Sequence, residues 1–126
     1  MPSRLRSDSK PVVEFDPLLE LSPFVLFRNL RDKQPVMLVD VRAAPAGWTL
    51  RGAQSYPGDQ GPWPEERRIV LFDDDGSEAY PIGRRLQQAG QAQVKVLFGG
   101  LELYEFALDP EVVGADTYLE RIGSTG

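Results

Sequence analysis

Three short apolar runs, separated by segments with helical spacing, constrain the fold of this chain more than any other feature. The runs are residues 36–41, 69–72 and 94–98. A continuous apolar run of this length is typical of a strand that is buried on both faces, as in a parallel sheet. Because such strands alternate with helices along the chain, the pattern predicts an α/β fold with helices on both faces of the sheet.

The ends of the expected helices carry their own signals. Ser22 and Pro23 predict a helix start, with Ser22 as the N-cap and Pro23 in the first turn, where its missing N–H does no harm. Ser77 is a second predicted N-cap, for a helix over residues 78–89 that Gly90 ends. Shorter elements are expected as strands at residues 12–15 and 53–56, a helix at residues 101–108 and a helical turn at residues 116–122.

The 126 residues predict one domain built on a parallel sheet of about five strands. Residues 1–10 are polar and are expected to be flexible. Residues 11–109 are expected to form the domain, and residues 110–126 a C-terminal tail with a short helix that packs on it. Functional groups of parallel sheets gather at the carboxyl ends of the strands. The loops that follow residues 41 and 72 are therefore the candidate site.

The chain contains no cysteine and no histidine. Disulfides, thiolate metal sites, thiol nucleophiles and a Ser-His-Asp triad are therefore excluded. The net charge is −5 and the basic residues are isolated or paired, which argues against binding of nucleic acid or of an anionic membrane. No run approaches the roughly 20 apolar residues of a membrane span. The N-terminus does not read as a signal peptide, so a cytoplasmic location is expected.

The second apolar run leads into an acidic loop, which consists of Asp73, Asp74, Asp75, Gly76, Ser77 and Glu78. Acids near the first turn of a helix are stabilised by its dipole by about 0.3–1 kcal/mol each, and Asp and Gly suit tight turns. The loop is therefore predicted to be structural and solvated. Two further interpretations stay open: cation binding, with Asp73 and Asp75 as ligands, and docking of a basic partner. No cofactor is predicted.

A series of short motifs runs through residues 20–108. They are, in order, Leu21-Ser22-Pro23, Asp40-Val41-Arg42 after a buried strand, Gly52-Ala53 with Pro57, the strand at 69–72 before a tight loop, residues 86–90, and residues 94–101 with Gly99-Gly100-Leu101. In this order and spacing they resemble the rhodanese-like (sulfurtransferase-type) domain family. The resemblance implies a rhodanese-like fold for most of the chain.

In that family a cysteine follows the strand that matches residues 69–72, and it opens a loop whose backbone N–H groups hold an anion or a persulfide. Here Asp73 stands at the cysteine position, and Asp74 stands where a basic residue is often found. A carboxylate cannot carry transferable sulfur, and a reactive thiolate needs positive surroundings. We therefore predict a catalytically inactive rhodanese-like domain, not an enzyme, that acts as a protein-interaction or regulatory module.

The same loop also resembles the first motif of haloacid-dehalogenase-type phosphatases, in which an apolar strand leads into Asp-x-Asp-Gly-Ser/Thr. In this alternative Asp73 is the nucleophile and Asp75 the general acid/base of a magnesium-dependent phosphatase or phosphotransferase. The position of the motif in mid-chain argues against it, and Lys95, the one lysine downstream, lies in an expected strand. A third alternative is a metal-binding acidic loop without turnover.

Asp40 and Arg42 close the first apolar run. The resemblance implies that they organise the loops around the pocket, and a local ion pair is the simplest interpretation. Trp48, Tyr56 and Trp63 surround the long loop that follows. These aromatic side chains are predicted to plug the pocket, and would be interface candidates if exposed.

The partner is expected to be another protein, which the sequence does not identify. The chain itself is expected to be a monomer or a weak homodimer. If part of the stripe formed by Leu103, Tyr104 and Phe106 is exposed to solvent, a homodimer contact is expected there.

Overall fold

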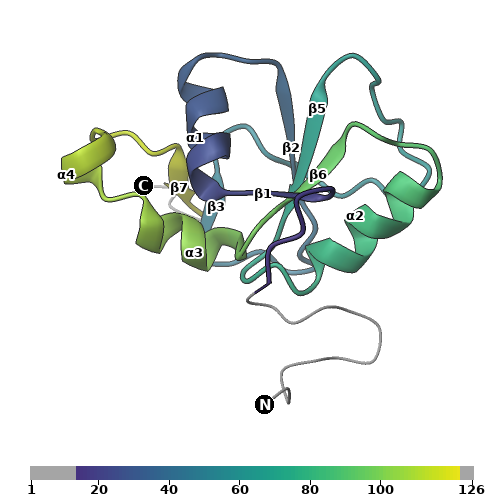
Figure 1. The fold of residues 1–126 in the computed structure, drawn as a ribbon. Coiled ribbons are helices and arrows are strands. Elements are labelled where there is room, and N and C mark those ends of the chain that lie inside the picture. The colour runs from purple at the N-terminus through teal and green to yellow at the C-terminus, as the bar shows by residue number, and fades with distance from the viewer. Residues whose placement is uncertain (1–13, 123–126) are drawn as a thin grey trace.

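The computed structural model describes residues 14–122 and has a five-stranded parallel sheet at its centre (Figure 1). The order of the strands across the sheet is β1-β6-β5-β2-β4, and every neighbouring pair is parallel. This confirms the predicted fold class and number of strands. The strands are β1 (Glu20–Leu21), β2 (Val36–Asp40), β4 (Gln54–Ser55), β5 (Arg68–Phe72) and β6 (Val94–Leu97).

Helices cover both faces of this sheet, because its central strands are apolar on both sides. In β5, Ile69 and Leu71 pack with α2 (Ala79–Gln88) on one face. Val70 and Phe72 pack on the other face with α1 (Pro23–Arg31) and α3 (Gly100–Ala107). All four of these side chains are fully buried. Two separate cores, one on each side of the sheet, therefore hold the layers together (Figure 1).

Two of the predicted helix ends are confirmed. The Ser22 hydroxyl accepts the backbone N–H of Val25 at 3.2 Å, so Ser22 caps α1 and Pro23 begins it. Gly90 follows α2 with a φ of +104°, in the left-handed region that favours glycine.

The predicted N-cap of α2 is wrong. The helix begins at Ala79, and its cap residue Glu78 makes no side-chain capping bond. The Ser77 hydroxyl instead donates to the carboxylate of Asp75 at 2.6 Å. Asp73 caps the helix from a distance, since its carboxylate accepts the N–H groups of Glu78 and Ala79. The prediction failed because a helix can be capped by a side chain several residues before its start, as Asp73 does here.

The first strand lies later than predicted. Residues 1–10, 12 and 13 lie outside the described residues, and residues 14 and 15 are not in a strand. β1 forms instead because the carbonyl oxygens of Leu19 and Leu21 accept the N–H groups of Val96 on β6 and of Phe98 just after it. Leu19 and Leu21 are buried, whereas Phe15 is exposed, so burial favours the later segment.

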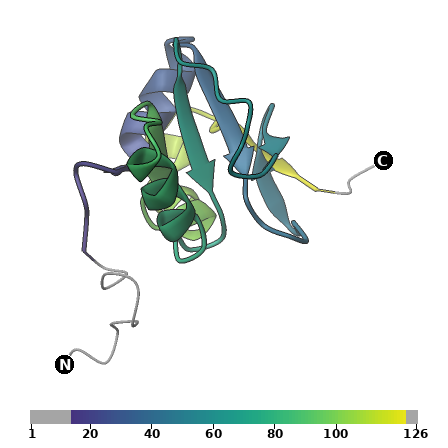
Figure 2. The ribbon, with the colours of Figure 1, turned by 90° about the vertical axis from the view of Figure 1, so that its right-hand side faces the viewer.

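The C-terminal tail contains a strand where a helical turn was predicted. β7 (Leu119–Arg121) pairs antiparallel with β3 (Trp48–Leu50), a strand that was not predicted either. Figure 2 shows β7, in yellow, on the side of the molecule away from β1. The expected short helix is present earlier, as α4 (Pro110–Val113). The tail packs through partly buried Val113 and Leu119 on the core beside α1 and α3.

None of the helices within residues 14–122 has both the length and the apolar character that crossing a membrane requires.

Candidate functional site

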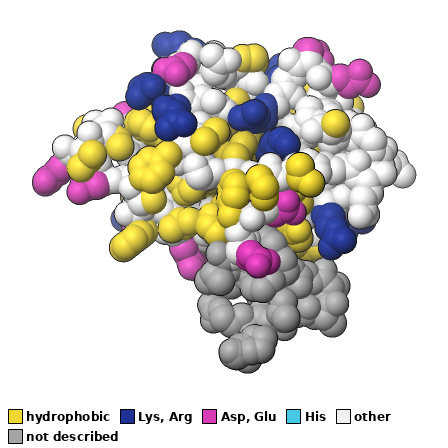
Figure 3. Space-filling model, in the orientation of Figure 1, with side chains coloured by type: hydrophobic (Ala, Val, Ile, Leu, Met, Phe, Trp, Pro, Cys, Tyr) yellow, Lys and Arg dark blue, Asp and Glu magenta, His cyan; other side chains and the backbone are white. Residues whose placement is uncertain are grey.

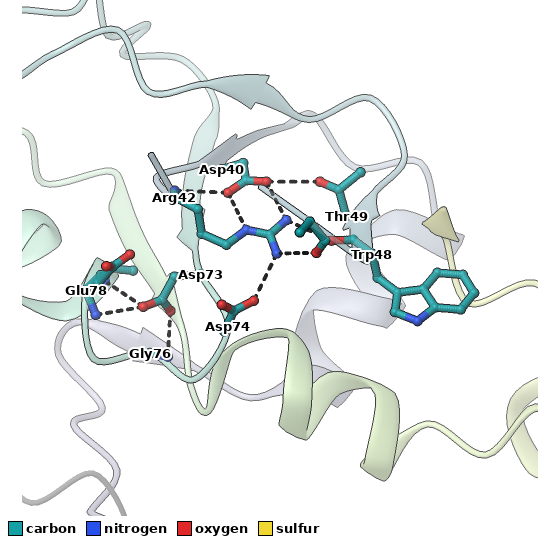
Figure 4. Close-up of polar contacts among 10 residues, drawn as sticks. Asp40, Arg42, Trp48, Thr49, Asp73, Asp74, Gly76 and Glu78 are labelled. Carbon is teal, nitrogen blue, oxygen red and sulfur yellow. Dashed lines mark hydrogen bonds and ion pairs between the residues drawn. The ribbon is translucent and has the colours of Figure 1, made fainter. Parts of the chain in front are cut away.

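The two candidate loops meet at one edge of the sheet, as their strands predict. β2 pairs with β5 in a register that puts Asp40 opposite Phe72, so both strands end side by side. Asp40 is the last residue of β2, and Asp73 is the first residue after β5. Figure 4 shows both carboxylates at this edge, on either side of the Arg42 side chain, with Asp74 of the acidic loop directed at Arg42. The fold therefore brings together the acidic loop and the Asp-Val-Arg step.

Arg42 uses all of its side-chain donors at this edge. Its guanidinium makes two bonds to the Asp40 carboxylate, from Nε to Oδ1 at 2.9 Å and from Nη2 to Oδ2 at 2.7 Å. Nη2 also donates to the carbonyl oxygen of Trp48 at 2.7 Å. Nη1 donates to the carbonyl oxygen of Ala46 at 3.1 Å and to Oδ1 of Asp74 at 2.9 Å. Since a guanidinium has five N–H groups, Arg42 has none left for a ligand in this arrangement.

Asp40 and Arg42 form a buried pair. Only 6% of the Asp40 residue is exposed, and 6% of the Arg42 side chain. The hydrogen bond to Asp40 raises the pKa of Arg42 above its ordinary value, so the guanidinium is always charged. Thr49 adds a weaker bond from its hydroxyl to Oδ2 of Asp40 at 3.3 Å. These contacts support the predicted organising role, because one side chain ties the loop after β2 to the loop after β5.

Asp73 is buried inside its own loop, with 1% of the residue exposed. Its Oδ1 accepts the N–H of Gly76 at 2.5 Å, and its Oδ2 accepts those of Glu78 at 2.6 Å and Ala79 at 3.3 Å. Burial raises the pKa of Asp73 to about 6, and the three N–H donors act in the opposite direction. The carboxylate is therefore an internal anion held by backbone amides.

The other three acids of the loop, Asp74, Asp75 and Glu78, are exposed. The prediction of a solvated acidic loop is therefore confirmed for these three and wrong for Asp73. The reason is that a six-residue loop which turns back on the end of β5 encloses its first side chain (Figure 4) and leaves the three later acids exposed.

The start of α3 holds the acidic loop from the other side. The N–H groups of Leu101 and Glu102 donate to the carbonyl oxygens of Asp73 and Asp74, each at 2.9 Å. Gly100 has a φ of +65°, and a Cβ atom there would lie 2.5 Å from the backbone carbonyl of Asp74. Only glycine allows this close approach. The Gly-Gly-Leu step therefore serves the packing of α3 on the loop.

The geometry of the loop gives no support to a metal or a phosphoryl intermediate. Both oxygens of Asp73 accept backbone N–H groups, and Asp75 accepts from the backbone and hydroxyl of Ser77. Lys95 donates to the carbonyl oxygen of Leu18 at 3.0 Å, beside β1. In the part of the chain that the structure describes, no three acidic side chains are arranged to hold a metal ion.

The three aromatic candidates differ in exposure. Trp63 is only 8% exposed, and its indole N–H donates to the carbonyl oxygen of Asp59 at 2.9 Å. Its ring centre lies 6.2 Å from that of half-buried Tyr56, and both pack on the core beside α2, so Trp63 is too buried to be an interface residue. Trp48 is 36% exposed, with the guanidinium of Arg121 5.0 Å from its ring centre. Of the three, Trp48 is the one that reaches the surface.

A hollow of about 120 Å³ lies beside Trp48, next to the acidic loop. The acidic residues Asp74, Glu102 and Glu105 are among those that line it, together with Leu101. This negative lining is compatible with the predicted docking of a basic partner, which stays a prediction.

Comparison with known proteins identifies the fold. No model of a known protein family matches the sequence, and no curated protein matches it. Solved structures do match. A rhodanese-related protein from Thermoplasma volcanium shares 14% identity at a TM-score of 0.59, over 71% of this chain and 92% of that one. A rhodanese homolog from Thermus thermophilus shares 24% identity at a TM-score of 0.55, over 67% of this chain and 98% of that one.

The fold is rhodanese-like. A third match, a thiosulfate sulfurtransferase from Pseudomonas aeruginosa, shares 22% identity at a TM-score of 0.59, over 71% of this chain and 19% of that one. At these identities the likeness concerns the fold alone, and function must be argued from the site. In this rhodanese-like domain, the loop after β5 opens with a buried aspartate.

Proposed function

We propose that this chain is a non-catalytic rhodanese-like domain that acts as a protein-interaction or regulatory module and has no sulfurtransferase activity. The observation that carries the proposal is the buried Asp73 carboxylate, which accepts three backbone N–H groups of its own loop. Those N–H groups are the donors that could otherwise hold an external anion or a persulfide. Here an anion that belongs to the chain already uses them.

The charge around the loop supports the same proposal. Asp74, Asp75 and Glu78 are exposed around the buried Asp73. Like charges about 4 Å apart repel by roughly 1 kcal/mol even in water, and more when partly buried. Arg42, whose guanidinium contacts Asp74 of this loop (Figure 4), has every donor engaged. Thiosulfate would therefore meet the negative charge of the loop and no free donor on Arg42.

The interaction role rests on what the surface offers. Large apolar side chains are exposed on the described part of the chain, with Phe106 at 86% and Val112 at 79%. Monomeric proteins seldom leave such side chains together in water without a binding role. The cytoplasmic location expected from the sequence belongs to this proposal as well.

A sulfur-transfer assay tests the catalytic half of the proposal. The wild-type chain, incubated with thiosulfate and cyanide, should form thiocyanate only at the rate of the buffer, because it offers no sulfur nucleophile. In parallel, Asp73→Cys places a thiol in the same backbone cradle. Attack of this thiolate on thiosulfate would release sulfite and leave a persulfide, and cyanide would take the outer sulfur as thiocyanate and restore the thiolate.

The matched control is Asp73→Ser, which has similar size and no sulfur. We expect mass spectrometry to detect an added sulfur atom on Asp73→Cys alone, and to detect it slowly, because the acids of the loop remain and repel thiosulfate. Turnover by the wild-type chain above that of Asp73→Ser would contradict the proposal, because it would show sulfur transfer by a route that needs no cysteine.

A further inference from the structure

Five exposed apolar residues lie on α1, on α3, on α4 and just before β1, and we call them the apolar face. They are Phe15, Leu18, Phe24, Phe106 and Val112. Figure 3, in the orientation of Figure 1, shows hydrophobic side chains gathered in a broad band over α1, β1 and α3. α1 and α3 pack against each other, which makes the band continuous. The proposed function assigns no specific occupant to this band.

The two helices under the apolar face carry opposite charges. On α1, Phe24, Arg28 and Arg31 follow one another at helical spacing and are exposed; Arg31 also forms an exposed ion pair with Asp32 at 3.1 Å, which a second copy would have to share. On α3, Glu102 lies one turn before Phe106 and Glu105 lies beside it, and both acids are exposed. In Figure 3 the basic side chains lie mainly above the hydrophobic band, and acidic ones lie to its left, below it and at the top of the molecule. The α1 side of the face therefore carries exposed basic residues, and the α3 side carries exposed acidic ones.

This arrangement is complementary to itself. A two-fold axis that lies in the contact plane between α1 and α3 places α1 of one copy on α3 of the other. Phe24 then meets Phe106, and Arg28 and Arg31 meet Glu102 and Glu105, twice over. We propose that the partner of the apolar face is a second copy of this chain, in an isologous dimer held by Phe106 and flanked by these charges.

The charge pattern favours a second copy over an unlike protein. The chain has a net charge of −5, so two copies repel each other at long range. Association therefore requires local pairing of opposite charges, which the two-fold arrangement supplies at both ends. Because the general repulsion remains, the dimer should be weak and its population should rise with concentration.

Sedimentation equilibrium of the full chain over a wide concentration range tests the dimer. Wild type should shift from monomer to dimer, and Phe106→Ala should raise the dissociation constant by about tenfold or more, as expected for an aromatic anchor. Since Phe106 is 86% exposed, the substitution should leave the fold intact, which circular dichroism checks. A wild-type chain that stays monomeric at every concentration overturns the proposal and leaves the face to an unlike partner.

Charge reversal tests the two-fold geometry separately. The variants Arg28→Glu/Arg31→Glu and Glu102→Lys/Glu105→Lys should each lose self-association. Mixed together they should form a heterodimer, because both ends then pair opposite charges again. The matched control is Glu65→Lys/Glu66→Lys, which changes two exposed acids in the segment after Trp63 and should dimerise at least as well as wild type. Failure of the mixture to associate would overturn the two-fold arrangement.

This inference rests on the proposed function in one respect, since it names the partner of an interaction module. The two can fail independently. Absence of a dimer would leave the sulfur-transfer result unchanged, and sulfur transfer by the wild-type chain would leave the sedimentation result unchanged.

Discussion

Two buried carboxylates at the same edge of the sheet are stabilised in different ways. Asp40, at the end of β2, is paired with the guanidinium of Arg42 by two hydrogen bonds. Asp73, just after β5, is bonded to three backbone N–H groups, and no ion pair of Asp73 is found among the described residues. The first carboxylate is balanced by a full opposite charge, and the second only by dipoles.

The two buried charges are therefore sensitive to different changes in the molecule. The charge of Asp40 is balanced by one cation, so a single substitution of Arg42 can leave it buried and unpaired. Asp73 is held by the backbone of its own loop, so its contribution to stability follows its own protonation state. Substitutions and a change of pH should therefore affect the two carboxylates differently.

Replacing Arg42 should have the largest effect. Arg42→Met keeps the aliphatic part of the side chain but leaves Asp40 without its cation and the carbonyl groups of Ala46 and Trp48 without their donor. Breaking a buried pair in this way costs about 3–5 kcal/mol, which urea unfolding measures. The control Arg51→Met removes exposed pairs with Asp116 and Glu120 and should change stability little. Equal losses in both variants would refute the contrast.

The second prediction concerns pH. Because the pKa of Asp73 is about 6 in the folded chain and ordinary in the unfolded chain, the folded state holds the proton more tightly. The stability this contributes is present below about pH 4 and is lost as pH rises through 6. The free energy of unfolding should fall by up to about 3 kcal/mol between pH 4 and 7, relative to Asp73→Asn.

Urea unfolding of wild type and Asp73→Asn at several pH values provides this comparison, since the other acids titrate alike in both. Two curves that stay parallel from pH 4 to 7 would mean that the amide donors fully offset the effect of burial on Asp73.

The smallest effect is expected for Asp74, which bridges the two loops. Its side chain is 65% exposed, although its partner Arg42 is buried. Asp74→Ala leaves the guanidinium paired with Asp40, so the loss should be below about 1 kcal/mol. A loss as large as that of Arg42→Met would show that Asp74, rather than Asp40, is the main partner of the guanidinium.

Much of the sheet could be predicted because its signals are local. The apolar runs that became β2, β5 and β6 are continuous, and Ser22 and Gly90 stand next to the helix ends that they define. The placement of Asp40 and Asp73 at the same edge of the sheet could be predicted because neighbouring parallel strands end side by side.

The parts that could not be predicted depend on contacts between distant residues. β3 and β7 are each three residues long and form only because they pair with each other across about 70 positions of sequence. The capping of α2 by Asp73 was missed because the acid lies six positions from Ala79. Gly76, three positions after Asp73, was the available signal, since a tight turn there returns the backbone to the carboxylate.

The hydrogen bond from Arg42 to the carbonyl oxygen of Trp48 joins the central sheet to the two-stranded ribbon of β3 and β7, although no strand of one sheet pairs with a strand of the other. Trp48 belongs to β3, whose partner β7 comes from the far end of the chain. The guanidinium of Arg42 thus connects the ribbon of β3 and β7 to the central sheet and to the acidic loop. We expect the ribbon and the loop to open as one cooperative unit in hydrogen exchange, so that a molecule bound at Trp48 would slow amide exchange around Asp73.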